Sequence, residues 1–150
     1  MLLSDIFHEQ SIVLNLTGKI KADVLTELVA AIAVVHPEYD QNIMLNVIQE
    51  RESKMGTGIG SGVAIPHGCC SGMNDIIGAI GISKTGIDDY HSLDNQPVHI
   101  LFLMVMGEHC REKHLHVLSR VMELCNSEAL TSIRTAKSVE EIHAMLSRFN

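Results

Sequence analysis

His67 is the residue in this sequence best placed to do chemistry. It follows the short apolar run 63–65 and Pro66, and it precedes Gly68. A histidine held between a proline and a glycine at the end of a strand lies where α/β folds place functional groups. An imidazole with the ordinary pKa of about 6.5 is neutral and nucleophilic near pH 7, so His67 could accept a phosphoryl group and pass it on. The alternative is a structural histidine bonded to a nearby carbonyl.

Arg51 is a candidate for binding the same group. It precedes His67 and a glycine-rich segment. The planar guanidinium of an arginine binds two phosphoryl oxygens at once, and charge spreads over three equatorial oxygens during phosphoryl transfer. The alternative is that Arg51 is a solvated surface residue, and the ion pairs of such residues contribute little to stability.

The glycine-rich segment 54–62 has glycine at every second position from Gly56 to Gly62. It contains neither G-x-G-x-x-G nor Gly-Lys-Ser/Thr, so neither nucleotide-binding pattern applies. One interpretation is a tight turn between a helix and a strand. The other is a nest of backbone N–H groups that receives an anion such as a phosphoryl group.

Three histidines and a cysteine are concentrated in one short segment: His109, Cys110, His114 and His116. A metal site completed by the cysteine pair 69–70 or by His67 is one interpretation, although the spacing matches neither H-x-x-x-H nor C-x-x-C. In a helix, His114 and His116 point about 200° apart and cannot serve one site. His114 lies near the apolar face and can reach inward, whereas His116 meets solvent. Ordinary surface histidines are the alternative for all three.

The elements that position these residues alternate between strand and helix patterns. Short apolar runs predict strands at 12–16, 63–65, 76–82 and 98–106, the last central because it is almost wholly apolar. Apolar stripes predict helices over 19–35, after an N-cap at Asp40, from about Glu112 with Leu115, Leu118, Val121, Met122 and Cys125 inward, and after a capping box at Ser138. The order predicts an α/β or α+β fold, a mixed β-sheet flanked by helices.

Composition narrows the classes of function. The 150 residues, 46% of them hydrophobic, suit a single folded domain, and the net charge of −7 disfavours binding to nucleic acid or anionic membranes. No run of about 20 apolar residues and no signal-peptide pattern occurs, so we expect a cytoplasmic protein with reduced cysteines and no direct membrane insertion.

Taken together, these motifs resemble one family closely. The string runs from Arg51-Glu-Ser through Gly56-Thr-Gly-Ile-Gly60 to Gly62-Val-Ala-Ile-Pro-His67-Gly, and a later His-Leu opens a helix. It is similar to the fructose/mannitol-type enzyme IIA domain of the bacterial phosphoenolpyruvate–sugar phosphotransferase system, and the resemblance covers nearly all of residues 1–150. It departs from the family's pattern at Met55, at the cysteine pair 69–70 and in the segment 107–111.

The resemblance implies the site residues and their roles. His67 matches the phosphorylated histidine, Arg51 the arginine that steadies the phosphoryl group, and His114 the second histidine of the site. Gly58, Gly60 and Gly62 would line the same phosphoryl pocket, with Thr57 as a hydroxyl donor. It implies no cofactor and no metal.

The resemblance also implies the partners. An HPr-type phosphocarrier protein would supply the phosphoryl group. The opening and length favour the nitrogen-regulatory branch, which acts on a regulatory target protein, and the alternative is a sugar-specific component that passes the group to a IIB domain. A second alternative is a metal-binding protein built on the histidine and cysteine cluster.

Cys69 and Cys70 directly follow the acceptor motif. One hypothesis is that a cationic pocket lowers the pKa of these thiols and makes them oxidisable, so that peroxide would inhibit phosphorylation. The alternative is that both are small buried residues.

Overall fold

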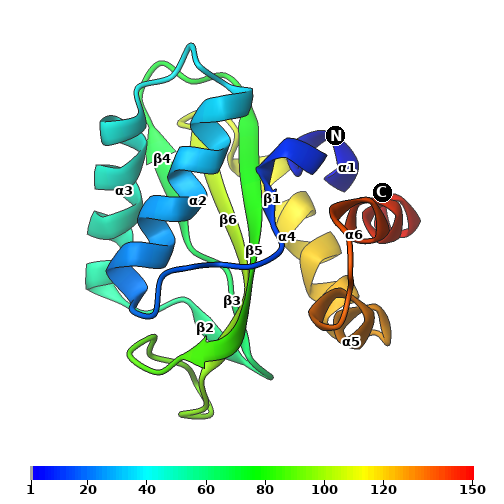
Figure 1. The fold of residues 1–150 in the computed structure, drawn as a ribbon. Coiled ribbons are helices and arrows are strands. Elements are labelled where there is room, and N and C mark those ends of the chain that lie inside the picture. The colour runs from blue at the N-terminus through cyan, green and yellow to red at the C-terminus, as the bar shows by residue number, and fades with distance from the viewer. Residues whose placement is uncertain (1) are drawn as a thin grey trace.

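Six strands form one mixed sheet in the computed structural model, which describes residues 2–150 (Figure 1). The strand order is β1-β5-β6-β3-β2, and β4 also pairs with β6. The strands are β1 (Ile12–Val13), β2 (Gly58–Gly60), β3 (Val63–Ala64), β4 (His67–Cys70), β5 (Ile76–Ile87) and β6 (Val98–Gly107). β5 and β6 pair antiparallel, whereas β3 and β4 both run parallel to β6.

Helices cover both faces of this sheet (Figure 1). On one face lie α2 (Lys21–Val35) and α3 (Gln41–Lys54). On the other lie α1 (Leu3–Ile6), α4 (Arg111–Cys125), α5 (Ala129–Arg134) and α6 (Val139–Leu146). Two short 3-10 helices complete the fold, Glu9–Ser11 and Ser147–Phe149. None of the helices in residues 2–150 combines the length and the apolar character that a membrane crossing requires.

The central strand β6 contributes side chains to two hydrophobic cores, one on each face of the sheet. Ile100, Phe102 and Met104 pack on the α4 side, whereas Leu101 and Leu103 pack on the α2–α3 side. This alternation is what a strand buried on both faces requires, and it explains why its sequence is apolar without interruption. The prediction of a central strand here is confirmed.

β3 and β4 are two parts of one extended segment along β6. Val63 pairs with Ile100 and His67 with Met104, so the register offset of 37 residues is the same in both parts. Pro66 separates them because it has no N–H to donate, but its carbonyl still accepts a hydrogen bond from the N–H of Met104 at 2.9 Å. His67 is thereby fixed at the first residue of β4.

Both predicted N-caps are confirmed. The Asp40 carboxylate accepts hydrogen bonds from the N–H groups of Asn42 and Ile43, and the Ser138 hydroxyl accepts one from the N–H of Glu141. In the predicted stripe of α2, all of Val24, Leu25, Leu28, Val29 and Ile32 are buried.

Other boundaries and faces differ from the sequence-based expectations. The first strand ends at Val13 rather than residue 16, because the chain bends there, and β5 continues to Ile87 through residues that look polar and turn-rich. On α4, Leu115 is 60% exposed, and Val117, Val121 and Leu124 are the fully buried positions. The predicted inward face was therefore wrong at Leu115 and missed Val117 and Leu124.

Candidate functional site

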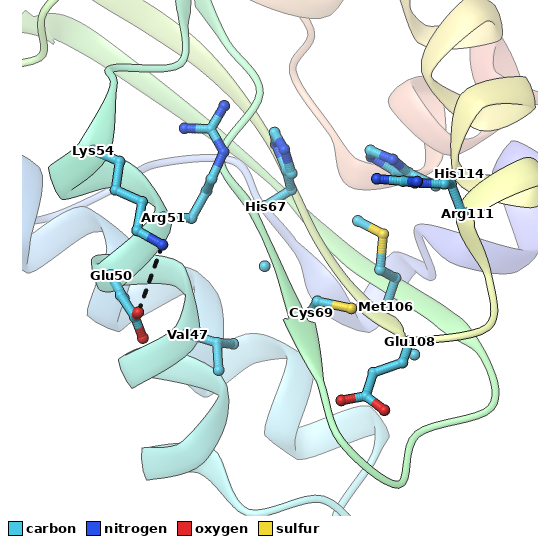
Figure 2. A pocket seen from close by; sticks show the side chains of 12 residues that line it. Val47, Glu50, Arg51, Lys54, His67, Cys69, Met106, Glu108, Arg111 and His114 are labelled. Atoms are coloured by element: carbon cyan, nitrogen blue, oxygen red, sulfur yellow. Dashed lines mark ion pairs between the residues drawn. The ribbon is translucent and has the colours of Figure 1, made fainter.

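The main candidate site is a cavity of about 610 Å³ between α3, β4 and the start of α4. Figure 2 shows His67 between Arg51, which comes from α3, and His114 and Arg111, which come from α4. The lining residues are Val47, Glu50, Arg51, Lys54, His67, Gly68, Cys69, Met106, Gly107, Glu108, Arg111 and His114. Three segments far apart in the sequence therefore meet at one histidine.

The His67 ring is held by its own backbone neighbourhood. Its Nδ1 lies 2.9 Å from the carbonyl oxygen of Ile65, two residues earlier. A carbonyl can only accept, so Nδ1 carries the proton and donates, and Nε2 carries the lone pair. The nitrogen left for nucleophilic chemistry is Nε2.

His114 faces His67 from α4. The centroids of the two rings are 5.2 Å apart, and their planes are inclined by 39°. The Nε2 atom of His114 is buried and has no hydrogen-bond partner. Burial first, and then the neighbouring His67, lower the pKa of His114 below its usual range, so its ring is neutral at pH 7. The His114 ring therefore has one nitrogen whose hydrogen-bonding capacity is unused.

Arg51 reaches the cavity from the last turn of α3. One of its terminal nitrogens, Nη1, donates to the carbonyl oxygen of Met55 at 2.9 Å, which orients the guanidinium and leaves the remaining N–H groups for an anion. α3 comes this near because β4 has a glycine beneath it: a Cβ on Gly68 would lie 2.9 Å from Cγ2 of Val47. Side chains alternate along a strand, so Gly68 faces α3 and His67 faces α4.

The cavity lining carries more positive than negative charge, although the chain as a whole is acidic. Three of its side chains are cations (Arg51, Lys54 and Arg111) and two are anions (Glu50 and Glu108). Lys54 pairs with Glu50 at 3.7 Å. With Lys54 and Glu50 paired, the cavity lining has two further positive charges, on Arg51 and Arg111, and one further negative charge, on Glu108. This excess of positive charge suits an anionic ligand.

Thr57 does not lie in this cavity, contrary to the expectation that it donates a hydroxyl there. Its hydroxyl donates to Oε2 of Glu52 at 2.6 Å and lies 2.8 Å from the Tyr90 hydroxyl, while its N–H donates to Oε1 of Glu52. Lys21 pairs with the same Oε1 at 3.0 Å. This buried network joins the start of α2 to the end of α3 and to the segment before β2. Thr57 therefore stabilises this buried network rather than the cavity around His67.

Gly58, Gly60 and Gly62 are also absent from the lining of the cavity. The N–H of Gly60 donates to the Ser92 hydroxyl and that of Ser61 to the Asp94 carboxylate, so these groups cannot serve as an anion nest. Gly60 and Gly62 have φ of 95° and 76°, values that glycine adopts without strain, and they form the turn between β2 and β3. The segment contains a tight turn, but this turn joins the strands β2 and β3 rather than a helix and a strand, and the N–H groups of Gly60 and Ser61 already have partners.

The histidine and cysteine cluster does not assemble into one site. His116 is exposed and lines a different hollow with Asp5, Glu112 and Lys113, as the helical spacing predicted. Within residues 2–150, no group of three or more His, Cys, Asp or Glu side chains is arranged to hold a metal ion. The metal-binding alternative therefore gains no support from the described residues.

The thiols beside His67 are less acidic than the oxidation hypothesis requires. Burial, followed by the nearby Glu108, raises the pKa of Cys69, and burial raises the pKa of Cys70. Cys69 is nevertheless exposed and lines the cavity, whereas Cys70 is buried in the α2–α3 core. The hypothesis of a lowered pKa is therefore wrong in direction for both thiols, and the alternative of a small buried residue holds for Cys70 but not for Cys69.

Arg111 is the site residue that sequence reasoning missed. It lies three residues before His114 on α4, so both side chains project from one helix face into the cavity. This spacing was available in the sequence, but it points to the site only once His114 is placed there.

Comparison with known proteins shows which family has this fold and this site. Residues 5–149 match the family model for the phosphoenolpyruvate-dependent sugar phosphotransferase system, EIIA 2. The chain belongs to the EIIA 2 family. It is 35% identical over 130 residues to the fructose-specific EIIABC component of Bacillus subtilis, covering 87% of this chain and 20% of that protein. The chain thus spans about a fifth of the length of that relative.

Other EIIA 2 relatives match over most of their length. The nitrogen regulatory protein of Escherichia coli K12 is 32% identical over 124 residues, with 80% of this chain and 74% of that protein covered. Among solved structures, the nitrogen regulatory protein IIA-Ntr of Neisseria meningitidis aligns with a TM-score of 0.88 at 26% identity, over 96% of this chain and 98% of that one. IIA mannitol of E. coli aligns with a TM-score of 0.70 at 15% identity, over 93% and 97%, which shows the shared fold.

The expected family and fold are therefore confirmed. The relatives carry both nitrogen-regulatory and sugar-specific names, and a phosphoryl-carrier role fits this EIIA chain.

Proposed function

We propose that this EIIA protein carries a phosphoryl group on Nε2 of His67, received from an HPr-type phosphocarrier protein. The observation that carries the proposal is the geometry of His67. Its Nδ1 is hydrogen-bonded to the Ile65 carbonyl. Its Nε2 is therefore the nitrogen that can attack a phosphorus atom, in the cavity that Arg51 and His114 also line. A histidine held in one tautomer does not need to lose a proton before it acts as a nucleophile.

The transfer step follows from these contacts. The lone pair of His67 Nε2 forms the new N–P bond as the P–N bond of the donor phosphohistidine breaks, and the donor imidazole keeps that electron pair. Positive charge develops on the His67 ring, and the Ile65 carbonyl stabilises it by accepting from Nδ1–H. Arg51 binds two phosphoryl oxygens, and His114 donates from its unpartnered Nε2.

We further propose a regulatory role for the phosphorylated state, of the kind that the nitrogen-regulatory relatives' name describes. The support is the higher TM-score with IIA-Ntr, 0.88 against 0.70 for IIA mannitol. Phosphorylation replaces a neutral ring edge by a strongly anionic group, which changes which protein can dock over the cavity.

A sugar-specific role is the second candidate, favoured by the 35% identity to the fructose-specific EIIABC component. A solved complex of IIA mannitol with phosphorylated IIB mannitol also aligns with this chain, at a TM-score of 0.71. In that role the protein passes its phosphoryl group to a IIB domain.

The test is transfer from radiolabelled phosphoenolpyruvate through Enzyme I and an HPr-type carrier to the wild type and to His67→Ala. We expect acid-labile, base-stable label on the wild type alone. Full labelling of His67→Ala would overturn the assignment of the acceptor. A chase with IIB domains then separates the two roles, because a sugar-specific component loses its label to a IIB domain and a purely regulatory one retains it.

A further inference from the structure

We propose that Arg111 is a second phosphoryl-binding guanidinium, acting from α4 on the side of His67 opposite to Arg51; this rests on the proposed function of His67. The phosphoryl group carried between the rings would thus be held by a pair of arginines rather than by Arg51 alone.

Arg111 is positioned beside the proposed phosphoryl acceptor. Arg111 lines the same cavity as His67, His114 and Arg51. It lies one helical turn before His114, and Figure 2 shows both side chains on the α4 wall with Arg51 across His67 from them. A phosphoryl group on Nε2 of His67 points into the space between these walls. Arg51 can bind two of its three outer oxygens in bidentate fashion, which leaves one oxygen turned toward α4.

The Arg111 guanidinium has no ion-pair partner among the described residues. Within residues 2–150, the ion pairs of the structure do not include Arg111, whereas Lys54 in the same cavity is paired with Glu50. Glu108, the other carboxylate of the lining, is in the loop before α4 and lies near enough to Cys69 to raise the pKa of that thiol. The guanidinium is therefore available to an incoming anion.

The charge of Arg111 also lies at an unfavourable end of its helix. Arg111 is the first residue of α4, and the N-terminus of a helix carries a partial positive charge that disfavours cations. The helix also lacks a side-chain N-cap hydrogen bond, since Cys110 provides none. Glu112 in the same first turn has the charge that favours this helix end, whereas the Arg111 charge becomes favourable there only beside an anion. A phosphoryl group on His67 is such an anion, and it converts an unfavourable charge into a favourable contact.

The experiment compares Arg111→Gln and Arg111→Lys with Lys113→Gln, a matched control that removes the same charge two residues along α4 from outside the cavity. We measure the rate of transfer from the phosphorylated carrier protein. In parallel, phosphoramidate phosphorylates histidine without a donor protein, and ³¹P NMR follows the second ionisation of the phosphoryl group. Thermal unfolding of each variant shows whether its fold is intact.

We expect Arg111→Gln to slow transfer by about 10- to 100-fold, the effect of losing one charge-assisted hydrogen-bond pair. The ³¹P titration midpoint should rise by about one pH unit, because a nearby cation stabilises the dianion. The transfer rate and the titration midpoint of Arg111→Lys should lie between those of wild type and Arg111→Gln. Lys113→Gln should match wild type in both measurements. Removing the arginine should not lower the melting temperature, because α4 loses an unfavourable charge.

The outcomes separate this proposal from the one it rests on. If Arg111→Gln matches Lys113→Gln in rate and titration, Arg111 has no role and His67 remains the carrier. If the carrier protein fails to label the wild type but phosphoramidate succeeds, the proposed donor is wrong, and the titration still decides for or against Arg111. If neither reagent labels His67, both proposals are overturned.

Discussion

The rings of His67 and His114 lie 5.2 Å apart, and the backbone already occupies one nitrogen of His67 while Nε2 of His114 has no partner. The two rings are therefore not equivalent. His67 has a fixed tautomer and a lone pair for attack, whereas His114 has a buried nitrogen without a hydrogen-bond partner in residues 2–150.

The first prediction concerns His114→Asn. The asparagine keeps a polar group near this position but cannot reproduce the reach of the imidazole Nε2. We expect phosphoryl transfer to slow by about 10- to 100-fold with the fold retained, since one hydrogen bond to a charged group is lost. Rapid-quench kinetics measure the rate, and His116→Asn, on the exposed face of the same helix, is the control. Equal rates for both variants would mean that His114 does not contact the phosphoryl group.

The second prediction concerns pH and stability. Because the pKa of His114 is lowered in the folded protein, the unfolded chain binds more protons at this residue between the folded pKa and about 6.5. The free energy of unfolding therefore falls as pH decreases through this window. Urea unfolding at pH 7.5 and 5.5 should show a smaller loss for His114→Asn than for wild type. Equal losses of unfolding free energy in the two proteins would show that protonation of the buried His114 ring does not destabilise the fold.

The third prediction concerns the buried network of Glu52, Thr57, Tyr90 and Lys21. Glu52→Gln removes the charge that pairs with Lys21, although the amide oxygen can still accept from Thr57. Since Lys21 is partly exposed and can regain water, we expect a loss of about 2–3 kcal/mol in the free energy of unfolding. Glu50→Gln breaks an exposed pair on the same helix and should change stability by less than about 0.5 kcal/mol. Chemical denaturation of both proteins distinguishes a structural network from surface charge.

The fourth prediction concerns the thiols. Cys69 is exposed beside the site, whereas Cys70 and Cys110 are buried, and burial raises the pKa of Cys125 to about 12. Iodoacetamide should modify Cys69 first in the folded protein, and faster as pH increases, because the thiolate reacts. Modification should also block labelling of His67 by filling the cavity. Mass spectrometry locates the adduct, and rapid modification of Cys70 in the folded protein would contradict the burial.

Much of the site was predictable from the sequence because its key residues are tied to local backbone signals. Pro66 and Gly68 flank His67, and this local pattern predicted a constrained backbone there; the structure makes His67 the first residue of β4, a strand that the sequence-based expectations did not include. His114 follows from helical periodicity with Leu118 and Val121. The family resemblance joined these residues to Arg51, and the structure brings all three to one cavity.

The remainder depends on tertiary partners that the sequence does not display. A run of alternating glycines is compatible with an anion nest until its N–H groups find acceptors, and here Ser92 and Asp94 supply them from a distant loop. Thr57 was misplaced because its hydroxyl contacts Glu52, five residues earlier and buried against expectation for a carboxylate, and Tyr90, from a distant segment. Arg111 was missed because a cation at a helix start looks like an ordinary surface charge.

The central claim is that Nε2 of His67 accepts the phosphoryl group, and one NMR measurement tests it directly. Long-range ¹H–¹⁵N correlation of the histidine rings, recorded before and after phosphorylation, identifies both the residue and the nitrogen that is modified. Phosphorus attached to Nε2 of His67, with Nδ1 still bonded to the Ile65 carbonyl, is the predicted result. Phosphorylation at Nδ1, or on His114, would contradict the account.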